Sequence, residues 1–190
     1  MAVTTQPSAS TDAADAVNVG VVVWLASELM FFAGLFAAYF TLRSTNSASA
    51  WPPDDVELDN VRAVLATGVL ILSSVTMHLA VHSARSARSR TLWLGVTMLL
   101  GAAFLANLLS EYATNTFQVD DNAYGSIFYL LTGFHGLHVL GGLLFMAAVI
   151  WSLRGRTELS AGTAVDVCSY YWHFVDVVWV AMFTTIYVVR

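Results

Sequence analysis

Five ionisable side chains interrupt long apolar stretches of this sequence, and their types could support proton transfer, lipid binding or metal binding. They are Glu28, His135, His138, His173 and Asp176. The spacings His135–His138 and His173–Asp176 are both i to i+3, which places each pair on one face of a helix. Each pair can therefore hydrogen-bond locally or present two polar groups to a neighbouring helix.

Residue types alone leave the chemistry of this set open. A proton relay, a lipid-headgroup site and a metal site are possible interpretations, and a purely structural polar lock between helices is as well supported. A metal is the least favoured of these, because histidine pairs of this spacing build di-iron sites only with several further carboxylates, and Glu28 and Asp176 are the only candidates. Haem ligation between His138 and His173 has little support, since the sequence lacks a second histidine pair and a haem-attachment motif.

Composition places these residues inside a membrane. Of the 190 residues, 57% are hydrophobic, 11% are charged and none is lysine, whereas soluble proteins are roughly a quarter charged. About 20 apolar residues in a helix cross the hydrocarbon core, and helices satisfy their own backbone hydrogen bonds there. The predicted spans are Val17–Leu42, Val61–Val81, Thr91–Tyr112, Gly125–Trp151 and Ala164–Val189. The sequence therefore predicts an all-α fold, an integral membrane bundle of five transmembrane helices.

One membrane domain, residues 17–190, is expected behind a flexible polar leader, residues 1–16. Arginines in the short loops indicate the orientation, because positive residues favour the cytoplasm. One side holds Arg85, Arg88, Arg90, Arg154 and Arg156, and the other holds Arg43, Arg62 and Arg190. This distribution predicts that the N-terminus lies inside and the C-terminus outside.

Counting along the predicted spans places three of the ionisable groups at similar depth. Glu28 is 11 residues and Asp176 is 12 residues from the inner end of its span, and His138 is 13 residues from the inner end of its own. At a rise of 1.5 Å per residue the three differ by about 3 Å. We therefore expect one polar layer that joins the first, fourth and fifth spans.

Polar and aromatic residues near the span ends have simpler interpretations. Glu111 and His78 are expected to reach the membrane interface by snorkelling, and Trp24 is expected to anchor its helix at the interface. Cys168 is the only cysteine, which excludes an internal disulfide or a multi-cysteine metal cluster and indicates a small core residue.

Three strings carry a resemblance to a known family. They are WLASELMFF (Trp24–Phe32), GFHGLHV (Gly133–Val139) and YWHFVDVVW (Tyr171–Trp179). In this order and on these spans they resemble the haem–copper oxidase subunit III family, and the likeness extends from about Val19 to Arg190. The chain is similar to the short, five-helix form of that family and looks actinobacterial. It departs from many members at Leu108, where they carry a polar residue.

The resemblance implies an accessory subunit of an aa3-type cytochrome c oxidase, in which electrons pass from cytochrome c to oxygen and protons are pumped. The chain would carry no catalytic, metal or cofactor-binding residue, and haem a and copper would lie in partner subunits. Its partners would be subunit I above all, subunit II, small subunits and phospholipids of the bacterial plasma membrane, and no nucleic acid. Docking of the oxidase to a cytochrome bc-type complex is a further expectation.

The same resemblance suggests roles for the ionisable residues. Glu28 matches the intramembrane glutamate of the family, and its signature polar positions correspond to His135, His138, His173 and Asp176. By that likeness they hold subunit I and its lipids and sustain proton uptake. The secondary positions are Ser27, His78 and Glu111.

Other functions stay open at this point. The equivalent subunit of a quinol oxidase, or a homologue associated with nitric-oxide reductase, has similar short forms. A self-sufficient proton carrier built on Glu28 and Asp176 is a more distant possibility, because transporters commonly use repeated halves and interrupted helices, which this sequence does not show. An independent cytochrome is equally distant.

Overall fold

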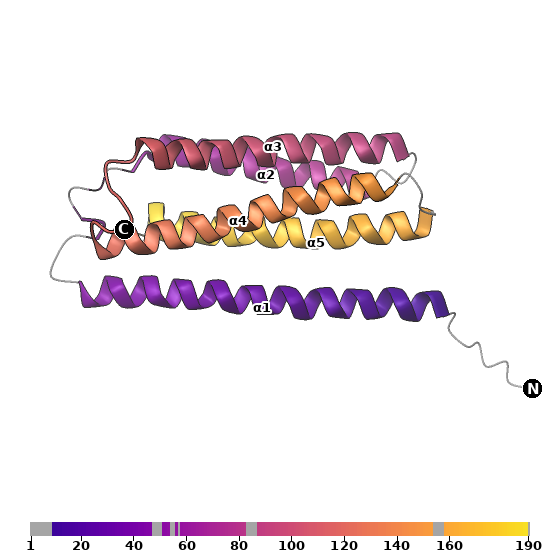
Figure 1. Ribbon diagram of the computed structural model, residues 1–190, viewed down its shortest axis with the longest axis horizontal. Coiled ribbons are helices and arrows are strands. Elements are labelled where there is room, and N and C mark those ends of the chain that lie inside the picture. Colours follow the sequence, from indigo (N-terminus) through magenta and orange to yellow (C-terminus); the bar gives the residue numbers. More distant parts are fainter. Residues whose placement is uncertain are drawn as a thin grey trace, which may run out of the picture.

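Five long helices make up the structure, a computed structural model that describes residues 9–46, 51–53, 56, 58–82, 87–153 and 158–189. They are α1 (Ala9–Thr45), α2 (Asn60–His82), α3 (Ala87–Thr114), α4 (Ala123–Ser152) and α5 (Glu158–Phe183), and a π-helical turn, η2 (Thr184–Val188), continues α5. All five are long and apolar enough to cross a membrane, and the described residues contain no strand. The predicted five-helix membrane bundle is confirmed. The helices run side by side, and α1 begins at the opposite end of the bundle from the end of α5 (Figure 1).

Several helices extend beyond their predicted spans. α1 begins at Ala9 rather than Val17, and α3 begins at Ala87 rather than Thr91. Hydropathy marks the part of a helix that lies in lipid, whereas alanine-rich polar sequence can continue the same helix outside it. The predicted polar leader is therefore helical from Ala9 onward, and its first eight residues lie outside the described residues.

The helices pack around α5, with α1 on the outside. α2 lies against α3 and α5, α4 lies against α3 and α5, and α1 packs along α4 and α5 (Figure 1). Within the most apolar window of each helix, 56% of residues are buried in α5 but only 6% in α1. α1 therefore leaves most of its apolar surface free for lipid or for another chain.

Trp172 on α5 is the centre of the packed core. Its side chain is fully buried, and its Nε1 donates a hydrogen bond to Ser73 Oγ on α2 at 2.9 Å. Gly101 of α3 and Gly142 of α4 face the indole ring, where an added Cβ would lie only 2.6 Å and 2.8 Å from ring atoms. The two glycines thus allow α3 and α4 to approach α5, as small residues do at helix interfaces in membranes.

Further hydrogen bonds connect the helices in the core. Trp179 Nε1 donates to Thr67 Oγ1 at 2.9 Å, which joins α5 to α2. The hydroxyl groups of Thr76 and Thr97 lie 2.8 Å apart and join α2 to α3. Such bonds fix how two apolar helices are aligned along each other, since lipid offers these polar groups no alternative partner.

The prediction that Glu111 snorkels to the interface is wrong. Glu111 is only 5% exposed, and its Oε1 accepts a hydrogen bond from the Tyr187 hydroxyl at 3.0 Å. The reason is tertiary: the turn η2 places Tyr187 beside the end of α3, and this contact cannot be inferred from the sequence of α3 alone. His78 is exposed, and its ring lies against that of His82, with centroids 3.9 Å apart and an interplanar angle of 35°. Cys168 is buried and free, so its prediction as a core residue is confirmed.

Candidate functional site

Glu28 of α1 and His138 of α4 meet within the membrane-spanning part of the bundle. Their Oε2 and Nε2 atoms are 3.1 Å apart, and the two side chains are 25% and 17% exposed, respectively. The other ring nitrogen of His138, Nδ1, lies 2.7 Å from the backbone oxygen of Phe134. Both nitrogens of the imidazole are therefore engaged.

This arrangement requires a proton in the Glu28–His138 contact. A carbonyl oxygen only accepts, so His138 Nδ1 must donate its hydrogen to Phe134. In a neutral imidazole the remaining nitrogen, Nε2, carries no hydrogen and can only accept. A hydrogen bond to Glu28 then exists only if Glu28 is protonated or if His138 carries a second proton. In either form the contact holds one proton between the two side chains.

Aromatic side chains surround the Glu28–His138 contact and join three helices around it. Trp24 donates its Nε1 hydrogen to Glu28 Oε1 at 3.1 Å, and its ring is stacked on Tyr171 of α5, with centroids 5.2 Å apart and an interplanar angle of 5°. The Tyr171 hydroxyl donates to the backbone oxygen of His138 at 2.9 Å. The ring of Phe32 packs edge to face against the His138 ring, with centroids 4.9 Å apart. Glu28, His138 and their neighbours thus fix α1 against both α4 and α5.

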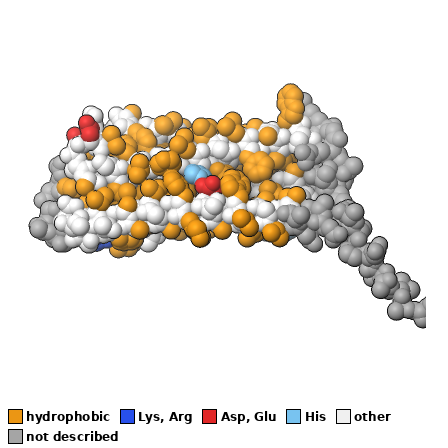
Figure 2. All heavy atoms as spheres, turned by 60° about the horizontal axis from the view of Figure 1, so that its bottom comes forward, with side chains coloured by type: hydrophobic (Ala, Val, Ile, Leu, Met, Phe, Trp, Pro, Cys, Tyr) orange, Lys and Arg blue, Asp and Glu red, His pale blue; other side chains and the backbone are white. Residues whose placement is uncertain are grey.

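The Glu28–His138 pair is not enclosed by the bundle, because both side chains keep part of their surface exposed. The face of the molecule drawn in Figure 2 is mostly hydrophobic along its length, with acidic atoms beside a histidine near the middle and further acidic atoms at one end. A polar spot surrounded by apolar surface at this level would be covered by lipid or by another membrane chain. Such an intramembrane polar group is a functional candidate by default.

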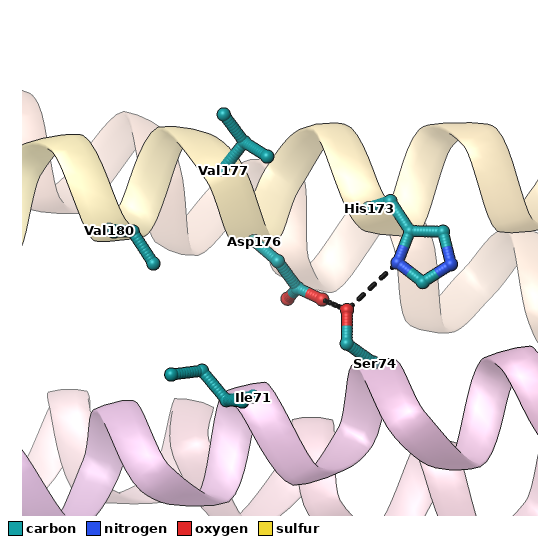
Figure 3. A pocket seen from close by; sticks show the side chains of 6 residues that line it. All are labelled: Ile71, Ser74, His173, Asp176, Val177 and Val180. Carbon is teal, nitrogen blue, oxygen red and sulfur yellow. Dashed lines mark hydrogen bonds between the residues drawn. The ribbon is translucent and has the colours of Figure 1, made fainter.

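A second polar cluster lies between α5 and α2. His173 Nδ1 is 2.8 Å from Ser74 Oγ, and Ser74 Oγ also has a short hydrogen bond to Asp176 Oδ2 (Figure 3). A hydroxyl has one hydrogen to donate, so Ser74 donates to one of these neighbours and accepts from the other. The cluster is a continuous hydrogen-bonded chain, His173–Ser74–Asp176.

His135 belongs to neither cluster. It is fully buried between Phe104 and Trp179, whose ring centroids are 5.8 Å and 5.1 Å from its own. Neither ring nitrogen has a hydrogen-bond partner among the described residues. The histidine packs as an aromatic side chain in the core.

The single polar layer predicted from the sequence is therefore divided. Glu28 and His138 come together as expected, but His173 and Asp176 face α2, and their direct partner is Ser74. The physical reason is that α1 packs on α4 and α5, so the polar face of α5 that carries Asp176 points to a different neighbour. Ser27 contributes only a local bond to the backbone oxygen of Trp24, at 2.6 Å.

Sequence reasoning missed the parts played by Trp24, Tyr171 and Ser74. Trp24 was expected to be an interface anchor, yet its i to i+4 spacing from Glu28 is the spacing at which helical side chains meet. That spacing was an available signal. Nothing in the spacing of Ser74 on α2 indicates a contact with α5.

Donor atoms for a metal ion do not gather among the described residues. No three His, Cys, Asp or Glu side chains converge within the described part of the chain. His138 and His173, considered as haem ligands, lie in separate clusters, and His138 uses both ring nitrogens in hydrogen bonds.

Comparison with known proteins shows a full-length match to one family. The family described as "Cytochrome c oxidase subunit III" matches residues 3–189. The chain is 48% identical over 180 residues to "Probable cytochrome c oxidase subunit 3" of Mycobacterium leprae, with 92% of this chain and 88% of the relative covered. It is 46% identical to the protein of the same name in Nocardia farcinica, with the same coverage. It is 41% identical over 181 residues to "Cytochrome c oxidase subunit 3" of Corynebacterium diphtheriae, again with 92% and 88% covered.

Proposed function

The chain belongs to the cytochrome c oxidase subunit III family, and from that premise we propose that it is the non-redox accessory subunit of an aa3-type cytochrome c oxidase. In this role it packs against the catalytic subunit I, beside subunit II and smaller subunits. Haem a and copper in those partners perform electron transfer to oxygen, which is coupled to proton pumping. This chain supports proton uptake and the durability of turnover.

The observation that carries this proposal is the Glu28–His138 contact at 3.1 Å. α1 is the least buried of the five helices, so few contacts hold it in place. Around Glu28, hydrogen bonds and the stacking of Trp24 on Tyr171 tie α1 to α4 and α5. The role of the contact is to hold α1 in a defined position, with its apolar outer face available to subunit I and to phospholipid.

The exposed side chains of α1 are suited to that role. Leu29 is 56% exposed and Met30 is 76% exposed, and both follow Glu28 directly. In a membrane this surface costs nothing when covered by lipid tails, so association depends on close packing and on polar contacts. A rigid α1 offers a partner helix a pre-ordered surface, which lowers the entropy that must be lost on binding.

The proton held between Glu28 and His138 keeps this contact electrically neutral within the membrane. The contact keeps one proton in either of its two forms. Moving that proton from one side chain to the other leaves the net charge of the pair unchanged. The pair can therefore stay within the membrane without a net charge.

The proposed setting is the bacterial plasma membrane, with the N-terminus inside and the C-terminus outside. The arginine distribution between the loops supports this orientation. Docking of the oxidase to a cytochrome bc-type complex fits the same setting, and so does bound phospholipid at the exposed apolar faces.

The substitution Glu28→Gln in the whole oxidase tests the proposal. The amide keeps the size of the side chain but cannot release a proton or carry a charge. We expect unchanged haem content, with several-fold faster loss of this subunit in detergent or several-fold faster inactivation during turnover. Ser27→Ala is the matched control, because it removes only a local bond one residue away. Loss of haem in the Gln variant, or behaviour equal to the control, would contradict the proposal.

A further inference from the structure

A pocket opens between α2 and α5, apart from the Glu28–His138 contact. Its volume is about 290 Å³, and it is lined by Ile71, Ser74, His173, Asp176, Val177 and Val180 (Figure 3). The polar residues form one end, where His173 and Asp176 are both bonded to Ser74. The remaining walls are apolar.

Asp176 brings an unsatisfied acceptor to this pocket. The residue is only 7% exposed, and its Oδ2 is bonded to Ser74. Its other oxygen, Oδ1, is buried and has no hydrogen-bond partner among the described residues. In Figure 3 this oxygen points away from Ser74, toward the space between Ile71 and Val180. A buried acceptor without a partner is destabilising, so a donor supplied from outside would be favoured.

The depth of Asp176 decides which kind of donor can reach it. The apolar span of α5 runs from Gly162 to Val188. At 1.5 Å per residue, Asp176 is about 21 Å from the first of these and about 18 Å from the second. A hydrocarbon core of about 30 Å keeps phospholipid headgroups near the span ends. A phospholipid headgroup therefore does not reach the level of Asp176, whereas a side chain on a membrane-spanning segment does.

The rim of the pocket is shaped for such a segment. Ile71 is 51% exposed, Val177 is 66% exposed and Val180 is 43% exposed, so the apolar walls open sideways into the membrane. Short branched side chains on two adjacent helices form a groove in which a third helix can pack. The combination of an apolar groove and one central acceptor matches an apolar helix with a single polar residue.

We propose that the α2–α5 pocket docks a transmembrane helix of another subunit, which inserts one hydrogen-bond-donating side chain toward Asp176 Oδ1. This inference rests on the proposed function, because it requires that the chain be a subunit of a membrane complex. The α2–α5 pocket is then a second contact surface, separate from α1, and Asp176 is the residue that recognises the partner. Asp176 is an acceptor for the partner here, and His173 and Ser74 hold its carboxylate in place.

Photo-crosslinking in the intact complex tests the inference. A benzoylphenylalanine in place of Val177 is irradiated in native membranes, and the adduct is identified by mass spectrometry. We expect an adduct with a different membrane-spanning protein chain. An adduct with lipid alone, with a second copy of this chain, or with no molecule would overturn the proposal.

Substitutions at Asp176, made in the strain that carries benzoylphenylalanine in place of Val177, test the proposed hydrogen bond from the partner helix. Asp176→Leu removes the acceptor at similar size and is expected to reduce the protein adduct at least fivefold. Asp176→Asn keeps an acceptor oxygen and is expected to retain most of the adduct. Equal adduct yield in the Leu and Asn variants would overturn the proposed recognition. Co-purification of the haem-bearing partner is measured in each strain, so failure of the inference can be told from failure of the proposed function.

Discussion

Glu28 on α1 and His138 on α4 lie 3.1 Å apart, and the second nitrogen of His138 is already committed to a backbone oxygen. This pairing brings together two residues 110 positions apart in the chain. It also joins the least buried helix to the packed bundle. The first prediction concerns the strength of that contact.

A double-mutant cycle should reveal coupling between these two side chains. His138→Leu and Glu28→Leu are each expected to destabilise the docking of α1 by about 1–3 kcal/mol, because each leaves a partly buried polar partner without its hydrogen bond. The double variant should lose less than the sum of the single losses, by about 0.5–1 kcal/mol or more. Thermal unfolding of the complex in detergent measures all four proteins. Additive losses would show that the contact contributes no coupling.

Substitution of Gly101 should disturb the packing around Trp172. In Gly101→Ala the new Cβ would lie 2.6 Å from the indole ring, so α3 or the ring must move. Overpacking of this kind costs about 1–3 kcal/mol. The matched control is Gly34→Ala, where no heavy atom lies within 4 Å of the added Cβ. Midpoints of unfolding in detergent should fall for the first variant and stay equal or rise for the second, and equal midpoints would argue against a tight Trp172 core.

Tyr187→Phe should destabilise the end of the bundle where η2 meets α3. The change removes the 3.0 Å bond to Glu111 Oε1 and leaves a carboxyl group buried without that donor. The expected cost is about 1–3 kcal/mol. In a Glu111→Leu background, the same Tyr187→Phe change should cost much less, because the stranded acceptor is gone. Proteolysis in detergent can compare the four variants, and an equal cost in both backgrounds would contradict the contact.

Orientation in the membrane is open to a direct chemical test. Val119, between α3 and α4, is 53% exposed, and His82 ends α2 near the opposite end of the bundle. We expect that a membrane-impermeant maleimide labels Val119→Cys in intact cells and labels His82→Cys only after permeabilisation. The native Cys168 is buried and should give little background. The reverse pattern would invert the proposed topology.

The number of helices and the similar depth of Glu28 and His138 could be predicted from the sequence, because both depend on simple periodic quantities. Hydropathy fixes where the chain can cross lipid, and counting residues along a helix fixes depth. Depth alone does not determine which neighbour a polar face meets, so Asp176 was assigned to the same layer as Glu28 although it faces Ser74 on α2. The burial of Glu111 was missed for a similar reason, since Tyr187 reaches it from a distant segment.

Purification of the tagged chain from its native membrane in mild detergent tests the central proposal most directly. We expect the tagged chain to co-purify with a large haem- and copper-bearing subunit, visible as haem a absorption bands. The complex should consume oxygen when it is supplied with reduced cytochrome c. Oxygen consumption with quinol in place of cytochrome c would contradict the proposed donor. A colourless chain without such a partner would contradict the accessory-subunit role itself.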